Sequence, residues 1–514
     1  MPKLQTINAS DDLTGGRLLA RNSIFNLLGE IVPFAAAVVA IPFLIKALGT
    51  DRFGVLSLVW IAIGYFSFFD LGLGRALTKF VSENLGSGQV EVIPEIVWTS
   101  LFLLLALGMA GTFAVSLLAR WMVYSALNIP VSLQPETLRS FYILALSLPF
   151  VVITAGLRGV LQAQQRFGLL NVVRVPMGLA AYLGPLLVLP FSHSLLPVVE
   201  VLATNRLIFA GIHLLLCFHV IPALKHRVIL NFSIVPGLLR FGGWITVSNI
   251  VSPAMLYLDR FIVSALLSTA AVAYYATPYS AVTALLLIPT GIVAVLFPAF
   301  ATSFVQDPGR AGRLCAQGVK VVLLAMFPIT LLIVAFARPG LTLWLGAEFS
   351  QHGFRVLQVL AIGILVNSLA FMPFALIQGA GRPDLTAKLH LFELPIYLPA
   401  VWGMTRRFGI EGTAIAWTAR VTVDALLLFI IARWLLPQGT FRLKHLEVPI
   451  ALALSVLAFS MIPKGVVSTA ATLVFIMVLF LYAAWFMILD SQERVLVQTL
   501  FSNRDFIRRW RSVE

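Results

Sequence analysis

Charged and amide side chains recur inside long apolar stretches of this sequence, where burying a charge in hydrocarbon costs on the order of 3 kcal/mol. The first such stretch carries Asn22, Asn26 and Glu30 at intervals of four residues, which places them on one face of a helix. Pro33 follows about one turn later and predicts a kink there. Because a lone carboxylate holds helices together poorly, we expect this face to line a cavity, although the asparagines suit helix–helix hydrogen bonds equally well.

Arginines form a second candidate group. Arg158, Arg174 and Arg206 lie on three consecutive apolar stretches. A guanidinium stays charged and binds oxyanions through two parallel hydrogen bonds, so arginines gathered at one cavity would suit a phosphate or an acidic sugar. The alternative for Arg158 and Arg174, which lie near the ends of their stretches, is that they extend to the membrane surface.

Further charges lie in the second half of the chain. Arg420 and Asp424 are one helical turn apart, which favours a local ion pair, and Arg420 is also a cavity candidate. The adjacent Asp259 and Arg260 either pair or lie at the membrane surface. Carboxylates inside a membrane often carry protons or ions. The candidates for coupling to protons or sodium are Glu30, Asp70, Asp259 and Asp424.

Composition predicts the fold class. Hydrophobic residues make up 60% of the 514 and charged residues 11%, against about 45–50% and about 25% in soluble domains. We therefore predict an all-α integral membrane protein with about 14 transmembrane helices, each about 20 residues long. The predicted spans are 18–46, 52–70, 93–118, 139–162, 169–190, 195–220, 236–265, 271–300, 316–337, 354–378, 386–404, 411–436, 446–462 and 467–489. The first span is too long for a cleavable signal peptide.

Basic residues are unevenly distributed between alternate loops, and the richer set stays in the cytoplasm. This distribution predicts that both termini are cytoplasmic. It also accounts for the net charge of +14 without a nucleic-acid partner, because no soluble basic domain is predicted. Residues 491–514 combine aromatic and basic side chains, which is typical of an amphipathic helix on an anionic leaflet or of a frayed terminus. Scattered histidines and two cysteines predict no metal site.

The two halves of the sequence resemble each other weakly. A shift of about 219 residues aligns Leu48-Gly49-Thr50 with Leu267-Ser268-Thr269, and it places Arg240 and Asn249 opposite Arg21 and Glu30. Shifts of about 216 and 214 align residues 162–166 with 378–382 and residues 204–206 with 418–420. We therefore predict an N-terminal lobe (1–221), a C-terminal lobe (222–437), two additional helices (438–490) and the basic tail. Parallel six-helix repeats are a transporter architecture with the substrate site between the lobes, which makes Arg240 and Asn249 cavity candidates.

Enzymatic motifs are missing from the sequence. Residues 72–75 read Gly-Leu-Gly-Arg but lack the preceding strand and the third glycine of a nucleotide-binding loop. We find no Walker motif, catalytic triad or long loop outside the membrane. The sequence therefore predicts neither an enzyme nor a chain that hydrolyses ATP, and it predicts no cofactor.

Several segments resemble the polysaccharide-transport family, the O-antigen and exopolysaccharide flippases of the multidrug/oligosaccharidyl-lipid/polysaccharide superfamily. They are residues 21–26 (RNSIFN), 41–44 (IPFL), 48–54 (LGTDRFG), 70–76 (DLGLGRA), 259–262 (DRFI), 273–275 (AYY) and 378–383 (QGAGRP). The resemblance implies two six-helix lobes in a V, alternating access, and transfer of an undecaprenyl-diphosphate-linked oligosaccharide to the periplasmic leaflet of the bacterial inner membrane. In a related lipid II flippase group the last two helices form a groove for the lipid tail, which implies the same for 438–490.

The resulting hypothesis places Arg21 and Arg240 at the cytoplasmic mouth, where they meet the diphosphate. Transport would be coupled to protons, sodium or the membrane potential, and the expected partners are membrane lipids and a glycan polymerase with its export machinery. Three alternatives remain: a multidrug or cation antiporter, a lipid-linked glycan polymerase or ligase, and a non-transporting assembly partner. An antiporter favours a carboxylate-rich cavity, and a polymerase usually needs a large periplasmic loop, whereas no loop here exceeds about 20 residues.

Overall fold

The structure is a computed structural model that describes residues 16–65, 70, 72–164, 166–238, 255, 257–437, 444–461, 465–488 and 494. Over these residues the chain is almost entirely helical and contains no strand. This agrees with the all-α class predicted from composition. It also fits a bilayer, because a helix satisfies its own backbone hydrogen bonds where water is missing.

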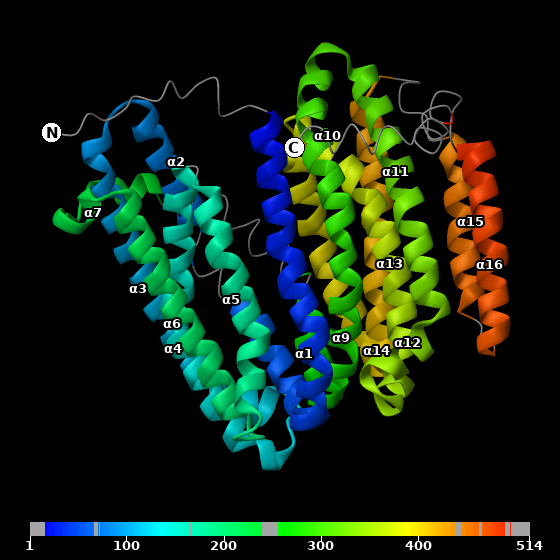
Figure 1. Cartoon of the computed structure of the whole chain (residues 1–514), viewed down its shortest axis with the longest axis horizontal. Coiled ribbons are helices and arrows are strands. Elements are labelled where there is room, and N and C mark those ends of the chain that lie inside the picture. The colour runs from blue at the N-terminus through cyan, green and yellow to red at the C-terminus, as the bar shows by residue number, and fades with distance from the viewer. Residues whose placement is uncertain are drawn as a thin grey trace, which may run out of the picture. The chain divides into compact units, whose positions relative to one another are not determined.

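Figure 1 shows the helices coloured in chain order. Two of them, α1 and α14, are each broken by a glycine. Helix α1 (Gly16–Tyr65) is interrupted at Gly49, with φ 77° and ψ 164°. Helix α14 (Pro383–Leu435) is interrupted at Gly409, with φ 62° and ψ −146°. These conformations are essentially restricted to glycine, because a Cβ would clash with the backbone. The break in α1 confirms that spans 18–46 and 52–70 are separate helices.

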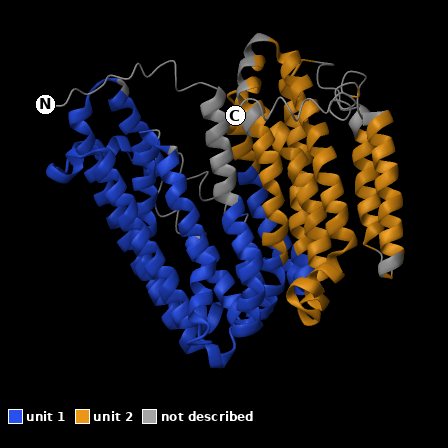
Figure 2. Ribbon diagram, in the orientation of Figure 1, with its two compact units in different colours: residues 1–277, 390–413 blue, residues 278–389, 414–514 orange. Residues whose placement is uncertain are grey.

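The first compact unit contains the described residues of 1–277 and 390–413 (Figure 2). Besides α1 it includes α2 (Leu73–Gly86), α3 (Ile93–Trp121), α4 (Gln134–Ala163), α5 (Phe167–Val188), α6 (Leu195–Val220) and α7 (Ala223–His226). Helix α4 packs against α3, α6 and α2, and α1 packs against α5. Small residues permit this close packing: a Cβ at Gly159 would lie 2.5 Å from the Gly74 carbonyl oxygen.

The second compact unit contains the described residues of 278–389 and 414–514. It includes α10 (Leu287–Gln306), α11 (Pro308–Ala335), α12 (Ala337–Leu345), α13 (Ala347–Gly379), α15 (Lys444–Ser460) and α16 (Val466–Ala483). Helices α9 (Thr269–Thr283) and α14 contribute residues to both units. The short α12 lies where the sequence predicted a loop. Helix α13 packs against α10, α11 and α12 and forms the centre of this unit.

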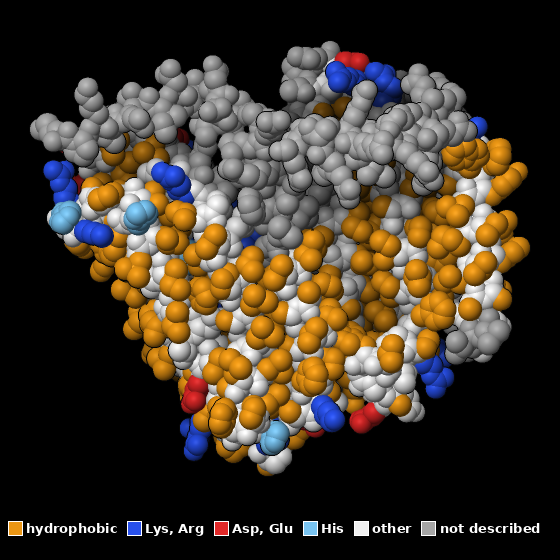
Figure 3. Space-filling model, in the orientation of Figure 1, with side chains coloured by type: hydrophobic (Ala, Val, Ile, Leu, Met, Phe, Trp, Pro, Cys, Tyr) orange, Lys and Arg blue, Asp and Glu red, His pale blue; other side chains and the backbone are white. Residues whose placement is uncertain are grey.

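Ten helices in the described chain are long and apolar enough to cross a membrane. Hydrophobic side chains cover most of the visible surface between the helix ends, where most charged side chains in view gather (Figure 3). The count of fourteen remains a prediction, since most of span 236–265 lies outside the described residues. The lobe boundaries near 221 and 437 also remain predictions, because they derive from a sequence repeat and the compact units derive from contacts. The tail beyond 490 is described only at Arg494.

We predict that Gly49→Ala lowers stability by about 1–3 kcal/mol, because alanine is strained at this backbone conformation. Apart from the adjacent backbone, no atom lies within 4 Å of the Cβ position, so the loss would come from local backbone strain and not from a clash with another helix. The matched control is Gly211→Ala. Gly211 has equal space at its Cβ position but a helical backbone, so alanine there should leave stability unchanged or raise it. Thermal unfolding in detergent provides the measurement, and equal melting temperatures for the two variants would contradict the prediction.

Candidate functional site

Two arginines share a cavity inside the first unit. Arg158 on α4 and Arg206 on α6 line a space of about 310 Å³ whose walls also come from α1 and α5. The aromatic residues Trp60 and Tyr182 lie in the same lining, with ring centroids 5.3 Å apart. Among the described residues that line the cavity, none is acidic. The described lining therefore carries an excess of positive charge.

Arg206 lies near the middle of its helix. It is about 16 Å from the first residue of α6 and about 21 Å from the last, at 1.5 Å per residue. Its side chain is half-buried. A cation at this depth is costly and marks a substrate or ion pathway by default, and low polarity strengthens its attraction for an anion.

The remaining polar groups of the cavity lining also favour an anionic ligand. The Trp60 indole Nε1 is buried and has no hydrogen-bond partner in the part of the chain that the structure describes. An unsatisfied buried donor costs about 1–3 kcal/mol, so a water or a ligand acceptor is expected there. The indole and the two guanidinium groups can only donate, and the Tyr182 hydroxyl can donate as well. Such a lining suits a ligand rich in acceptor oxygens, such as a phosphate.

The sequence-predicted arginines are thus brought together in part. Arg158 and Arg206 line one cavity, whereas Arg174 is half-buried on α5 and does not contribute to the lining. The sequence pattern left open whether the Arg158 side chain lines a cavity or extends to the membrane surface. Its contact with the cavity favours the first interpretation, although its side chain is also exposed.

Other predicted cavity residues cannot be placed with their side chains. Arg21, Asn22, Asn26 and Glu30 lie within helix α1, which confirms the helix on which their shared face depends. The described structure does not extend to these four side chains. Arg240 and Asn249 lie outside the described residues. Their roles remain predictions.

Asp259 and Arg260 form a buried ion pair, one of the two arrangements expected from sequence. The Arg260 Nη1 lies 3.2 Å from Asp259 Oδ1, and the Tyr275 hydroxyl donates to Asp259 Oδ2 at 2.6 Å. The guanidinium carbon lies 5.4 Å and 5.9 Å from the ring centroids of Tyr257 and Tyr275. A buried charge is normally retained only with such partners. This pair therefore has a structural explanation, and ion coupling at Asp259 remains a prediction.

The other candidate carboxylates lie in different settings. Asp70 is buried and its Oδ1 accepts a hydrogen bond from the Gly72 N–H at 2.8 Å, just before α2 begins. Arg420 is half-buried and Asp424 is buried one turn further along α14. The Arg420–Asp424 pair and ion coupling at Asp70 and Asp424 remain predictions.

Two turns that the repeat aligns with each other meet in the first unit. Thr269 Oγ1 donates to Asp51 Oδ1 at 2.9 Å, and the Asn128 side-chain amide donates to the Leu267 carbonyl at 2.5 Å. A Cβ at Gly54 would collide with the Thr269 backbone carbonyl, so only glycine permits this approach. We call these five residues the turn contact. The aligned tripeptides at 48–50 and 267–269 signalled both turns, but not that they meet.

An apolar cluster lies beside the turn contact. Val263, Val272 and Ala276 pack with residues from the first 141 positions, including Leu58, Val123 and Phe141. All of these are buried, and Val263, Val272 and Val123 are fully inaccessible. The cluster therefore excludes water at this end of the helices.

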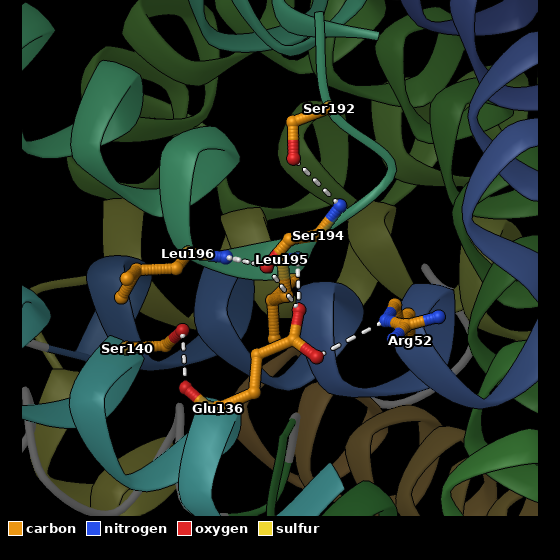
Figure 4. Close-up of polar contacts among 7 residues, drawn as sticks. All are labelled: Arg52, Glu136, Ser140, Ser192, Ser194, Leu195 and Leu196. Carbon is orange, nitrogen blue, oxygen red and sulfur yellow. Dashed lines mark hydrogen bonds and ion pairs between the residues drawn. The ribbon is translucent and has the colours of Figure 1, made fainter.

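Glu136 ties three segments together near the same end (Figure 4). Its carboxylate lies 3.2 Å from Arg52 Nε and accepts a hydrogen bond from the Ser194 hydroxyl at 2.7 Å. It also accepts from the Leu195 backbone N–H at the start of α6. A carboxylate is favoured beside helix N-termini, and Glu136 lies in the first turn of α4 as well. Glu136 was not among the residues predicted from the sequence, because its partners Ser194 and Arg52 are 58 and 84 residues away.

We predict that Gly54→Leu separates the turn contact, because the side chain cannot fit against the Thr269 backbone. Val272→Cys, which replaces a fully buried residue, should resist a water-soluble thiol reagent alone and react when combined with Gly54→Leu. Both native cysteines are buried, so background labelling should be low. Gly211→Leu, which has open space at its Cβ, is the matched control. Continued protection of the introduced cysteine in the Gly54→Leu, Val272→Cys double variant would refute the assignment.

Comparisons with known proteins agree with this architecture. Residues 19–304 match the family model described as polysaccharide biosynthesis protein. A candidate O-antigen transporter of Shigella flexneri is 29% identical over 80% of this chain and 96% of its own. The lipopolysaccharide biosynthesis protein WzxC of Escherichia coli K12 is 24% identical over 79% of this chain and 77% of its own.

Solved structures of transporters share the fold. The lipid II flippase MurJ in an inward closed conformation has a TM-score of 0.69 at 12% identity, over 90% of this chain and 99% of its own. An inward-facing multidrug resistance transporter of the MATE family, from the MOP superfamily, also has a TM-score of 0.69. Its identity is 14%, over 80% of this chain and 94% of its own. The first half of the sequence matches the family model directly, and the described helices match the superfamily fold. The chain therefore belongs to the polysaccharide biosynthesis protein family, with the fold of the MOP superfamily of transporters.

Proposed function

We propose that this protein is a flippase that moves an undecaprenyl-diphosphate-linked oligosaccharide from the cytoplasmic to the periplasmic leaflet of the bacterial inner membrane. The observation that carries the proposal is the cavity that Arg158 and Arg206 share without an acidic neighbour in the lining. The related O-antigen transporter and the lipopolysaccharide biosynthesis protein support the same substrate class.

Charge complementarity favours the diphosphate as the group bound there. A diphosphate diester carries roughly two negative charges, and two guanidinium groups match them in number. The Trp60 indole N–H and the Tyr182 hydroxyl supply further donors. The cavity of about 310 Å³ is suited to a head group and not to a long prenyl chain, which would remain in the lipid.

Alternating access gives the turn contact a role. It lies at the helix ends whose loops carry fewer basic residues, and these ends face the periplasm by the positive-inside rule. In the described arrangement the turn contact and its apolar cluster close this end of the first unit. Release of substrate to the periplasm would require Asp51 and Asn128 to part from Thr269 and Leu267.

The membrane potential could drive the transfer without another ion. Moving one elementary charge through 100 mV is worth about 2.3 kcal/mol. Two negative charges leaving a negative interior would gain about 4–5 kcal/mol, provided that the charges of the protein do not move with them. Coupling to protons or sodium through Glu30, Asp70, Asp259 or Asp424 is the other possibility.

A cation antiporter is the alternative that the fold itself raises, because a MATE transporter shares it. The cavity lined by Arg158 and Arg206 argues against a cation antiporter. A cationic substrate would meet two guanidinium groups there and no carboxylate in the described lining. A polymerase or ligase, or a non-transporting partner of a glycan polymerase and its export machinery, leaves this cavity without a purpose.

We predict that replacing both Arg158 and Arg206 by glutamine stops export. The affinity for the substrate should fall roughly tenfold or more for each charge–oxyanion hydrogen bond that is removed. Cells depleted of the wild-type protein and supplied with the variant should accumulate undecaprenyl-diphosphate glycan on the cytoplasmic leaflet. An impermeant glycan probe, applied to spheroplasts and to inverted vesicles, measures the distribution.

Arg174→Gln is the matched control, because Arg174 lies on α5, a helix that contributes to the cavity wall, but does not itself line the cavity. It should export normally. Normal appearance of the glycan on the periplasmic leaflet in the double variant, at wild-type protein levels, would refute the role of the cavity. The same result after complete depletion, in cells without a second flippase, would refute the flippase itself.

We also predict that a disulfide between Asp51→Cys and Thr269→Cys stops export and that a reductant restores it. The Asp51 carboxylate and the Thr269 hydroxyl are hydrogen-bonded at 2.9 Å, so cysteine side chains at the two positions face each other. Each single cysteine variant serves as a control and should export with or without reductant. Full export by the oxidised double variant would show that the turn contact need not open.

A further inference from the structure

A larger cavity lies in the second unit, separate from the arginine pair. It has a volume of about 710 Å³ and is lined by residues of α11, α12 and α13 on one side and of α15 and α16 on the other. Leu331, Phe336, Leu473 and Ile476 make much of its wall apolar. This volume lies within the range of small-molecule sites. An apolar cavity of this size beside lipid would fill with a hydrocarbon chain and not with water.

The cavity opens at the surface of the second unit, beside an exposed apolar helix. Helix α16 is the least buried of the candidate spans, with 6% of its most apolar window buried. Leu343 of α12 lies in the cavity lining and is 91% exposed, so the lining reaches the surface of the protein. A lipid chain could therefore enter sideways from the bilayer.

Among the described residues of this lining, one carries a positive charge. Arg338, the second residue of α12, is exposed, and its guanidinium carbon lies 5.7 Å from the centroid of the Phe354 ring. In the described chain its guanidinium makes no ion pair, and no lining residue is acidic. The other polar lining groups are uncharged, and Gln358 already donates its amide to the Val334 carbonyl at 2.9 Å. The cavity thus combines a long apolar wall with one guanidinium available to an anion.

We propose that this cavity is a binding site for an anionic membrane phospholipid, with the lipid phosphate on Arg338 and an acyl chain against α11 and α16. The match of charge favours a phospholipid over the substrate lipid tail that the family resemblance implies for residues 438–490, because a phosphodiester carries one negative charge and the described lining carries one cation. A diphosphate-linked lipid carries roughly two negative charges and fits the Arg158–Arg206 cavity better. The inference goes beyond the proposed flippase activity and does not depend on it.

The test measures lipid binding to the purified full-length protein by native mass spectrometry. The probes are phosphatidylglycerol, which is anionic, and phosphatidylcholine of the same chain length, which has no net charge. We expect the tightest-bound phosphatidylglycerol to bind about tenfold more weakly to Arg338→Gln, because a charge-assisted hydrogen bond is lost. Phosphatidylcholine binding should change little.

Two further variants separate head group from chain. Arg355→Gln is the matched control, because Arg355 lies 5.8 Å from the same Phe354 ring but does not line the cavity. It should retain phosphatidylglycerol as the wild type does. Thr472→Trp would fill the cavity without changing any charge, and it should remove the tight site for both lipids.

Three results would overturn the proposal. They are unchanged phosphatidylglycerol binding by Arg338→Gln, unchanged tight binding of either lipid by Thr472→Trp, and an equal loss in Arg338→Gln and Arg355→Gln. Co-purification of a lipid-linked glycan, identified by its mass and lost in Thr472→Trp, would also overturn it and assign the cavity to the substrate. Because each readout is binding, failure here leaves the export experiments unaffected.

Discussion

A positive charge placed among transmembrane helices must be matched by an anion, by water or by protein dipoles, and this requirement organises the first unit. Arg260 meets it internally, through Asp259, Tyr275 and two aromatic rings. Arg206 instead shares its cavity with a second arginine and no lining carboxylate. The first arrangement contains its own counter-charge, and the described lining of the second contains none. This difference is why the cavity, and not the ion pair, is the better candidate for substrate binding.

Close backbone approach determines where the first unit can close. Gly54 lets the turn before the second half of α1 press against the backbone of Thr269, and Asp51 then reaches the Thr269 hydroxyl. The strained backbone of Gly49 sets the direction in which that turn leaves the first half of α1. Glycine is needed at the two positions for different reasons, space at Gly54 and backbone conformation at Gly49. A contact held by a few hydrogen bonds and an apolar cluster is strong enough to exclude water and weak enough to open.

The sequence predicted the fold class and most helices, because apolar length and turn residues are local signals. Breaks at Gly49 and near Gly409 fell between predicted spans for the same reason. Long-range partners could not be predicted. Glu136 meets Arg52 across 84 residues and Asp51 meets Thr269 across 218, and nothing in either local pattern specifies the other. Arg158, which lines the cavity, could not be distinguished from Arg174, which does not, because both lie near predicted span ends and an uncertain span boundary leaves the direction of a side chain undetermined.

The two cavities together bear on how such a protein would tell its substrate from the surrounding lipid. Phospholipids carry one phosphate and outnumber any glycan carrier, so a single cation in the transport pathway would select poorly. Two guanidinium groups, carried by α4 and α6, favour a diphosphate by their charge. A single guanidinium at the start of α12, beside an apolar cavity, suits the abundant lipid. On this argument the number of arginines in a cavity, more than its volume, decides which lipid it holds.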